Sequence, residues 1–370
     1  RLEYRGYDSA GVALIDGDNL SIEKKEGKLS VLKEHLEGTS IKGNIGIGHT
    51  RWATHGVPSD VNAHPHADNA NEFAIIHNGI IENYAELKDD LIQDDYSFIS
   101  ETDTEVVAVE LSRKWNGELL DTVLDVAKSL DGTYALVVTS TKQPGTIVAG
   151  RMMSPLVLGV GEGEVFLASD SAAILEYTNK MIFLENGDFV EINDGNFSLY
   201  DIEKNVITRD IQVIDWEVSE AEKAGHDHFM YKEILEQAEV IERTIAGRIE
   251  NNSTEIPIHL DKAKKFEKIW IVACGTAYHA GLFGKDLFEK VLEVPVSVEL
   301  ASEFRYREPI IGKNDLAIVI SQSGETMDTI AATELLKENG SHVLALVNVV
   351  GSSLARMADS VFSVSYTHLR

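Results

Sequence analysis

The chain is short of several residue types, and each shortage excludes a class of protein. A single cysteine, Cys274, excludes an internal disulfide and a cysteine-based zinc finger and fits a reducing compartment. No apolar run reaches the ~18 residues of a membrane-spanning helix. Basic residues are also few: the chain has 33 Lys and Arg but 61 Asp and Glu, so its net charge is −28. That charge argues against nucleic-acid and membrane partners, so a phosphate site must be built locally from amides and hydroxyls.

The remaining composition is that of an ordinary globular protein. Of 370 residues, 44% are hydrophobic and 25% are charged, and at ~150 residues per domain this length predicts two domains. The character of the sequence changes near residue 217, where an acidic, helix-prone stretch begins. We therefore expect a first domain over 1–218, a linker with a helix over 219–250 and a second domain over 251–370.

The first domain is predicted to combine β-strands with helices. The apolar run 73–77 is typical of a short strand. Over 81–92 and 103–115, apolar residues recur every three or four positions, which predicts two helices. Thr102 or Asp103 is suited to cap the second helix.

In the second domain, strand patterns alternate with helical ones. Strands are expected at 269–273, 315–320 and 342–348, in a parallel, doubly wound sheet of three or four strands. Two of these strands lead into a helix through polar corners, at 274–276 and 321–326. Since the carboxyl ends of parallel strands meet at one edge of a sheet, both corners should face one crevice.

The corner at 321–326 has the composition of a phosphate-binding loop. Its hydroxyls and the unpaired amides of the following helix N-terminus suit an anion, and the lack of a Gly-Lys-Ser/Thr sequence excludes a Walker A loop. The alternative is an ordinary helix cap by Ser323 or Thr326. Cys274, at the other corner, is a candidate nucleophile or, as we favour, a small buried hydrophobic residue, since no basic residue lies near it in the sequence.

Histidines are concentrated in one stretch of the first half. A metal site is conceivable there, and also at His226 and His228. No cysteine or close pair of carboxylates completes such a site, so we expect no metal. Five of the 12 histidines form the concentrated stretch: His49, His55, His64, His66 and His77.

Two charged residues and an amide pair carry the chemistry expected of the first half. Arg51 is suited to grip a carboxylate and Asp103 an ammonium group, so together they would hold an α-amino acid. The alternative for each is an ordinary ion pair. Asn78 and Gly79 offer a side-chain amide and an unhindered backbone N–H, which suit an oxyanion hole; the alternative is a hairpin turn.

Longer motifs in both halves point to one known family. They lie at 5–11 (RGYDSAG), 49–56 (HTRWATHG), 62–66 (NAHPH), 77–83 (HNGIIEN), 100–105 (SETDTE), 273–276 (ACGT), 299–307 and 321–326 (SQSGET). Through these motifs the chain resembles the glutamine–fructose-6-phosphate aminotransferases (isomerizing) over almost its whole length. The first half is similar to their glutaminase domain and the second half to the first part of their sugar-isomerase module.

The resemblance implies a fold and an activity. The fold is an α+β N-terminal-nucleophile (four-layer αββα) glutaminase domain, followed by part of an α/β doubly wound parallel-sheet sugar-isomerase domain. Glutamine would be hydrolysed, the ammonia channelled, and fructose 6-phosphate converted to glucosamine 6-phosphate, without pyridoxal phosphate or metal. The resemblance further implies a cytoplasmic homodimer whose ligands are L-glutamine and fructose 6-phosphate.

The resemblance also implies residue roles. Asn78 and Gly79 would form the oxyanion hole, and Trp52 would line or gate the route of ammonia. The glutamine-binding residues would be Arg51, Thr54, His55 and Asp103. The sugar-phosphate-binding residues would be Thr276, Ser321, Gln322, Ser323 and Thr326.

Some features depart from the family pattern. The family's cysteine nucleophile is expected before Arg1 and the rest of the isomerase module after residue 364, so the printed chain alone is expected to be inactive in both half-reactions. Residues 365–370 do not resemble the family. Ala238 stands where the family usually has proline, and Ala277 where some members have a serine hydroxyl.

Two other functions fit parts of the sequence. One is a non-catalytic regulator that binds sugar phosphate, and the other is a different class-II glutamine amidotransferase. The corner at 321–326 argues against a different class-II glutamine amidotransferase, because those enzymes share only the first half of this chain.

Overall fold

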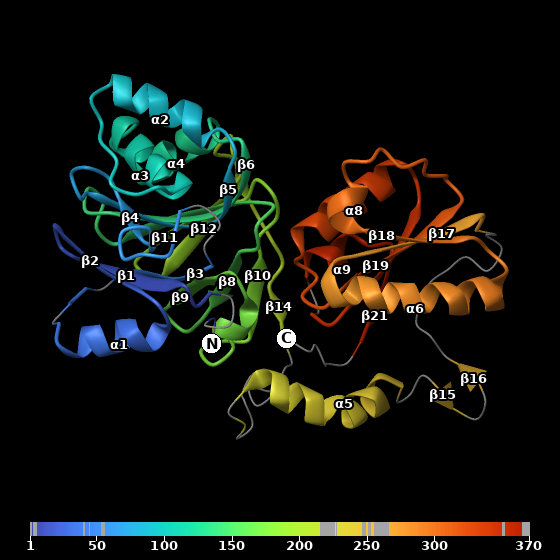
Figure 1. Cartoon of the computed structure of the whole chain (residues 1–370). Helices are drawn as coiled ribbons and strands as arrows, with labels where there is room; N and C mark the ends of the chain where they lie inside the picture. The colour runs from blue at the N-terminus through green and yellow to red at the C-terminus, as the bar shows by residue number, and fades with distance from the viewer. Residues whose placement is uncertain are drawn as a thin grey trace. The chain divides into compact units, whose positions relative to one another are not determined.

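The computed structural model describes residues 2, 6–39, 41–43, 45–52, 56–214, 226, 228–245, 249–250, 253–254, 266–349 and 352–364. The chain divides into two compact units, Arg1–Ala221 and Glu222–Arg370 (Figure 1). Within the described residues, no helix is long and apolar enough to cross a membrane. The acidic stretch expected to be helical from residue 217 lies outside the described residues.

Three antiparallel sheets form the first unit. Their strands are β1 (Ser9–Asp16), β2 (Asn19–Glu26), β3 (Ile45–Arg51), β4 (His66–Ala67), β5 (Phe73–Ile81), β6 (Gly132–Ser140), β7 (Thr146–Met152), β8 (Val157–Val160), β9 (Val165–Ala168), β10 (Lys180–Phe183), β11 (Phe189–Asn193), β12 (Asn196–Tyr200), β13 (Val206–Ile207) and β14 (Gln212–Val213). The largest sheet has the order β13-β12-β11-β7-β6-β5-β4. The smaller sheets have the orders β2-β1-β3 and β14-β10-β8-β9.

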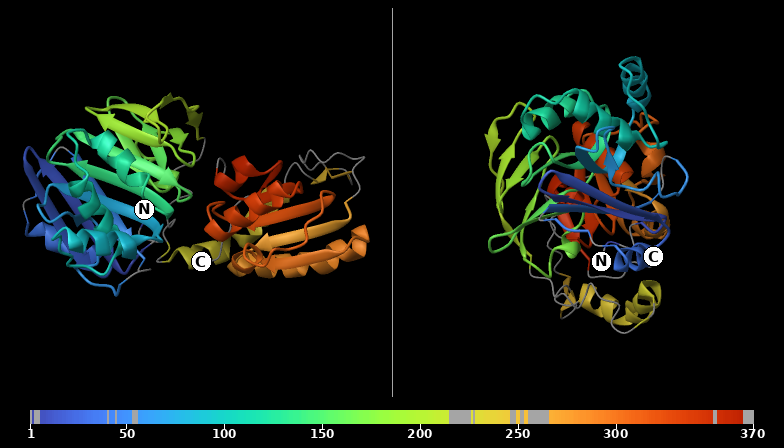
Figure 2. Two further views of the ribbon diagram at one scale, coloured as in Figure 1. Left: turned by 90° about the horizontal axis from the view of Figure 1, so that it is seen from above. Right: turned by 90° about the vertical axis from the view of Figure 1, so that its left-hand side faces the viewer.

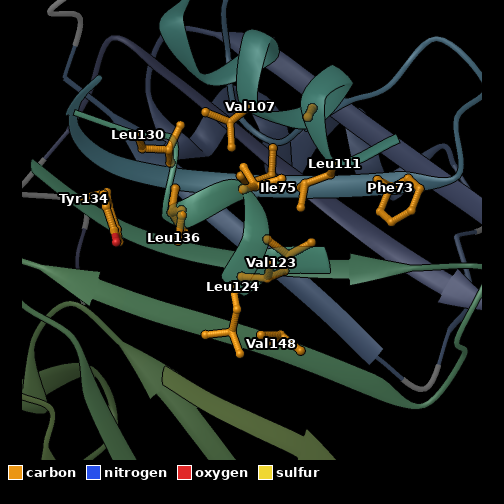
Figure 3. Packing of buried hydrophobic residues seen from close by; sticks show 14 of the residues in the cluster. Phe73, Ile75, Val107, Leu111, Val123, Leu124, Leu130, Tyr134, Leu136 and Val148 are labelled. Atoms are coloured by element: carbon orange, nitrogen blue, oxygen red, sulfur yellow. The ribbon is translucent and has the colours of Figure 1, made fainter. Parts of the chain in front are cut away.

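Helices and sheets of the first unit are stacked in layers. One face of the seven-stranded sheet is covered by α2 (Tyr84–Gln93), α3 (Asp103–Arg113) and α4 (Leu119–Ala127) (Figure 1). Figure 3 shows the core between them, where Ile75 and Leu136 of the sheet lie among helix side chains such as Val107. The other face packs on the smaller sheets, and α1 (Leu29–Glu37) contacts β1 and β2. This confirms the αββα architecture.

The sequence pattern accounts for most of these elements. Seven consecutive buried residues in β6 match its apolar sequence, as expected for a strand covered on both faces. By contrast β2 is an edge strand with charged side chains, so its sequence carried no strand signal. The two predicted helices begin and end close to the expected residues. The Oγ1 atom of Thr102 accepts a hydrogen bond from the Glu105 amide at 3.3 Å, which confirms the cap.

A parallel sheet forms the core of the second unit. Its strands are β17 (Lys268–Ala273), β18 (Val296–Leu300), β19 (Asp315–Ser321), β20 (His342–Val347) and β21 (Ser360–Ser363). The helices of the unit are α5 (Phe229–Ile245), α6 (Gly275–Leu292), α7 (Ala301–Phe304), α8 (Met327–Glu338) and α9 (Ser353–Met357). A short hairpin joins β15 (Ile249–Glu250) and β16 (Ser253–Thr254).

The strand order fixes where this sheet can bind a ligand. All neighbours in the order β18-β17-β19-β20-β21 are parallel, which confirms the doubly wound sheet, although it has five strands rather than three or four. The chain turns one way from β17 and the other way from β19, so right-handed crossovers place α6 and α8 on opposite faces (Figure 2). The carboxyl ends of β17 and β19 therefore flank the switch point, where open α/β sheets bind ligands.

Candidate functional sites

Arg51 ends β3 and is buried in the first unit, with only 4% of its surface exposed. Its Nη2 atom donates to the carbonyl of Gly56 at 3.4 Å. Burial lowers the pKa of its guanidinium, while the negative charges of Asp103 and Asp8 oppose that shift. A guanidinium is a planar donor that can bind a carboxylate through two hydrogen bonds, such as the carboxylate of an amino acid.

Asp103 opens α3 and is tied directly to β5. Its Oδ2 atom accepts a hydrogen bond from the Ile81 amide at 2.9 Å, and its Oδ1 atom accepts one from Thr104 at 3.4 Å. Asp103 is 5% exposed. The first turn of α3 is therefore fixed beside the end of β5, which brings Asp103 to the same region as Arg51.

Asn78 and Gly79 lie inside β5, which runs to Ile81, so the alternative of a hairpin turn is wrong. Gly79 has φ +132°, and a Cβ placed there would overlap the backbone carbonyl of Thr133. Only glycine fits this combination of backbone angle and space. The Oδ1 atom of Asn78 lies 2.8 Å from Nε2 of His49, on the facing strand β3.

Four of the five concentrated histidines pack together beside these residues. The rings of His49 and His64 are stacked with centroids 4.5 Å apart, and His66 meets His64 edge-on at 4.9 Å. His77 bonds through Nδ1 to the hydroxyl of Thr104 at 3.0 Å. Burial is the main cause that lowers the pKa of all four rings, to about 4 for His49. They are therefore neutral at neutral pH.

The remaining candidates of the first half are placed only in part. Trp52 is 57% exposed and its ring lies edge-on to that of Tyr7 at 5.3 Å. Thr54 and His55 lie outside the described residues. Among the described residues, no group of three or more His, Cys, Asp or Glu side chains is arranged to hold a metal ion. The structure thus brings together Arg51, Asn78, Gly79 and Asp103.

The corner after β19 forms a compact polar loop in the second unit. The hydroxyls of Ser321 and Thr326 lie 2.9 Å apart, and Ser321 Oγ also accepts from the Gly324 amide at 3.1 Å. Ser323 Oγ accepts from the Glu325 amide at 3.2 Å. Thr326 is the N-cap residue of α8, but its side chain makes no capping bond, so the alternative of an ordinary Thr326 cap is wrong.

The corner after β17 lies at the same edge. Ala273 pairs with Ile320 in register, so Cys274 and Ser321 leave the sheet side by side. Thr276 is exposed in the first turn of α6. Cys274 is half-buried at the N-cap, so the favoured prediction of a buried residue is wrong. Two helix N-termini and several hydroxyls thus lie at the same edge of the sheet, an arrangement that suits a phosphate.

Sequence reasoning missed the contacts that hold these groups in place. His49 and Asn78 are 29 positions apart, and no local pattern links them. The same holds for Glu325, whose Oε1 atom accepts a hydrogen bond from the amide of Ser353, 28 positions away, at 2.7 Å. A third such contact joins Lys24 to Val61, 37 positions away, where Lys24 donates to the backbone carbonyl at 3.0 Å. Burial lowers the pKa of Lys24 to about 8.

Comparison with known proteins assigns the class of each half. Residues 24–214 match the family described as glutamine amidotransferase domain, and residues 262–367 match the SIS domain family. The fold is similar to that of a solved structure described as the allosteric regulatory enzyme of purine biosynthesis, with TM-score 0.50 and 18% identity over 94% of this chain and 76% of that one. The chain therefore belongs to the glutamine amidotransferase domain family.

Curated relatives share both halves in the same order. The chain is 50% identical over 98% of its length to the glutamine–fructose-6-phosphate aminotransferase [isomerizing] of Caldanaerobacter subterraneus subsp. tengcongensis. It is 48% identical over 100% of its length to the protein of the same name from Aquifex aeolicus. The resemblance drawn from the motifs is thus confirmed. The chain spans 60% and 61% of the lengths of these two relatives.

Proposed function

We propose that this chain is the glutaminase and first sugar-isomerase part of an enzyme that converts glutamine and fructose 6-phosphate into glutamate and glucosamine 6-phosphate. The observation that carries the proposal is the pairing of two unlike sites in one chain. The first unit holds a buried cation, a buried carboxylate and a partly buried amide, and the second holds a hydroxyl-rich loop at a switch point. An amide donor and a phosphosugar acceptor require one site of each kind.

In the first half-reaction, water replaces ammonia on the side-chain amide of glutamine. Arg51 binds the α-carboxylate with help from Thr54 and His55, and Asp103 binds the α-ammonium group. The cysteine thiolate that the family resemblance implies attacks the amide carbon, and the carbonyl oxygen becomes an oxyanion. Asn78 Nδ2 and the Gly79 backbone N–H stabilise that charge inside a site from which water is largely excluded.

In the second half-reaction, the ammonia condenses with the C2 carbonyl of fructose 6-phosphate and water leaves; a net proton shift from C1 to C2 then isomerises the imine to glucosamine 6-phosphate, whose carbonyl carbon is C1. Thr276, Ser321, Gln322, Ser323 and Thr326 hold the phosphate, helped by the N-termini of α6 and α8. Neutral donors suit this chain because its net charge of −28 provides no general attraction for a phosphate dianion. Trp52, at the surface of the first unit, lines or gates the path that ammonia takes.

The proposal extends to the setting of the enzyme. We place it in the cytoplasm as a homodimer, because the family it resembles works so, and the single cysteine suits a reducing compartment. Sedimentation of the full-length protein, with and without fructose 6-phosphate, tests the dimer. A monomer under both conditions would contradict it.

Glutamate release by the full-length protein with native termini tests the proposed reaction. We expect release that rises when fructose 6-phosphate is added, with glucosamine 6-phosphate formed in equal amount. Sugar-phosphate binding without glutamate release would contradict the proposal and favour a regulator. If glutamate release did not change with fructose 6-phosphate and the protein did not bind this sugar phosphate, the result would favour another glutamine amidotransferase.

A further inference from the structure

The amide of Asn78 has two orientations that differ in what they offer to a substrate. An asparagine side chain carries one acceptor, Oδ1, and one donor group, Nδ2. In the structure Oδ1 lies 2.8 Å from Nε2 of His49. This contact leaves Nδ2 on the side away from His49, where it is able to donate. The reversed amide would turn its donor toward the ring and present an acceptor oxygen to an oxyanion, which would be repelled.

The protonation of His49 determines which orientation is stable. With the proton on Nε2, the ring donates to Oδ1; with the proton on Nδ1, it would accept from Nδ2. His49 Nδ1 is buried and has no hydrogen-bond partner among the described residues. A buried N–H without a partner costs more free energy than a lone pair without one. The Nε2–H form, and with it the donating orientation of Asn78, is therefore favoured.

Neighbouring rings hold His49 at the angle that this bond needs. His64 stacks on it with an interplanar angle of 24°, and His66 supports His64 from the edge. His66 is in turn held by the hydroxyl of Thr102 at 3.1 Å. His64 and His66 are buried, and His49 is partly buried, with its Nδ1 atom shielded from solvent. Packing against these neighbouring rings thus helps to set the ring plane of His49.

We propose that His49 is a positioning residue of the glutaminase site, whose Nε2–H holds Asn78 Oδ1 so that Asn78 Nδ2 faces the developing oxyanion. The inference rests on the proposed function, because it presupposes glutamine hydrolysis at Asn78. His49 itself touches neither substrate nor nucleophile in this scheme. Its effect should therefore appear in kcat and should vanish when Asn78 is removed.

A double-mutant cycle in the full-length protein tests this dependence. His49→Phe keeps a stacking ring without a donor, and His49→Gln restores an N–H near the Nε2 position. Because losing one oxyanion donor lowers kcat about 10²–10³-fold, we expect His49→Phe to lower kcat about 10–100-fold with less than about a 2-fold change in glutamine KM. We expect His49→Gln to recover most of that loss.

The matched control is the same substitution in the Asn78→Ala background. If His49 acts through Asn78, His49→Phe lowers kcat no further there. An equal loss in both backgrounds would overturn the proposal, as would failure of His49→Gln to recover activity while its thermal stability matches that of the parent.

A spectroscopic measurement decides the hydrogen bond without turnover. Long-range ¹H–¹⁵N spectra of histidine-labelled protein should show His49 protonated at Nε2 and unprotonated at Nδ1. A proton on Nδ1 would overturn the proposal. Absence of glutamate release from the parent protein would instead contradict the proposed function, so the two failures are distinct.

Discussion

The two candidate sites are built by different means. In the first unit the groups lie on different elements, are buried or partly buried, and are held by long-range contacts such as His49–Asn78 and Ile81–Asp103. In the second unit they lie on one short loop and two helix starts, and they bond mainly to one another. A site of the first kind forms only when the whole core is folded, whereas a site of the second kind requires only the end of one strand and the start of one helix.

The difference matches the ligands that we propose for the two sites. An amino acid carries a cation and an anion at a fixed spacing, so rigid, buried partners of opposite charge are required. A phosphate is a compact anion that backbone amides and hydroxyls can satisfy locally. Substitutions at the most tightly packed positions of the first unit should therefore combine losses of stability and activity, whereas those in the second unit should affect binding alone.

The largest expected effect is that of Gly79→Ala. The positive φ and the overlap with the Thr133 carbonyl should together cost about 2–6 kcal/mol of unfolding free energy and abolish glutaminase activity. Urea unfolding and glutamate release measure the two effects. Gly163→Ala is the control, because Gly163 has φ +76° but open space around it, and it should cost about 1–2 kcal/mol. If Gly79→Ala and Gly163→Ala lowered the free energy of unfolding equally, β5 would tolerate a side chain beside Asn78.

Asn78→Ala comes next and separates chemistry from folding. We expect kcat for glutamate release to fall about 10²–10³-fold, because one oxyanion donor is lost, with little change in glutamine KM. Fructose 6-phosphate affinity, measured by calorimetry, should stay the same. A selective rise in KM with unchanged kcat would assign Asn78 to substrate binding instead.

Acid should destabilise the first unit through its buried histidines. The pKa of His49 is about 4 in the folded protein against 6.5 ordinarily, so the unfolded chain binds its proton more readily between these values. The contribution of the neutral His49 ring to the free energy of unfolding is fully present above pH 6.5 and is lost as the pH falls toward 4. At ~1.36 kcal/mol per pH unit, this loss amounts to about 3 kcal/mol. Hydrogen exchange of each unit measures this. His49→Gln should reduce the pH slope by one proton; an unchanged slope would contradict the assignment.

The smallest effect is expected from Ser323→Ala in the second unit. Loss of one hydrogen bond to a phosphate should weaken fructose 6-phosphate binding about 10–100-fold, at about 1.5–3 kcal/mol for such a bond. Thermal stability and glutamate release in the absence of sugar should match those of the parent. Unfolding of the variant would show that this loop, too, depends on the core.

The sequence predicted the second unit more completely than the first, because local contacts form the site of the second unit and long-range contacts form that of the first. The parallel sheet and its polar corners follow from local alternation, and the structure confirmed them. The candidate residues of the first unit were found singly, because Arg51, Asn78 and Asp103 lie on separate elements and only the fold brings them together. Interior strand β5 was predicted from the apolar run 73–77, whereas edge strand β2 was not predicted, because its charged side chains give no strand pattern. Contacts between distant residues, such as His49–Asn78, have no local signal.

Binding of both ligands to two single variants tests the central claim most directly. Calorimetry on the full-length protein should give parent-like fructose 6-phosphate affinity but sharply weakened glutamine binding for Arg51→Ala, since a buried charge-assisted pair is lost. For Ser323→Ala it should give the reverse. If either variant lost both ligands while folded, or lost the wrong one, the assignment of one site to each unit would be contradicted.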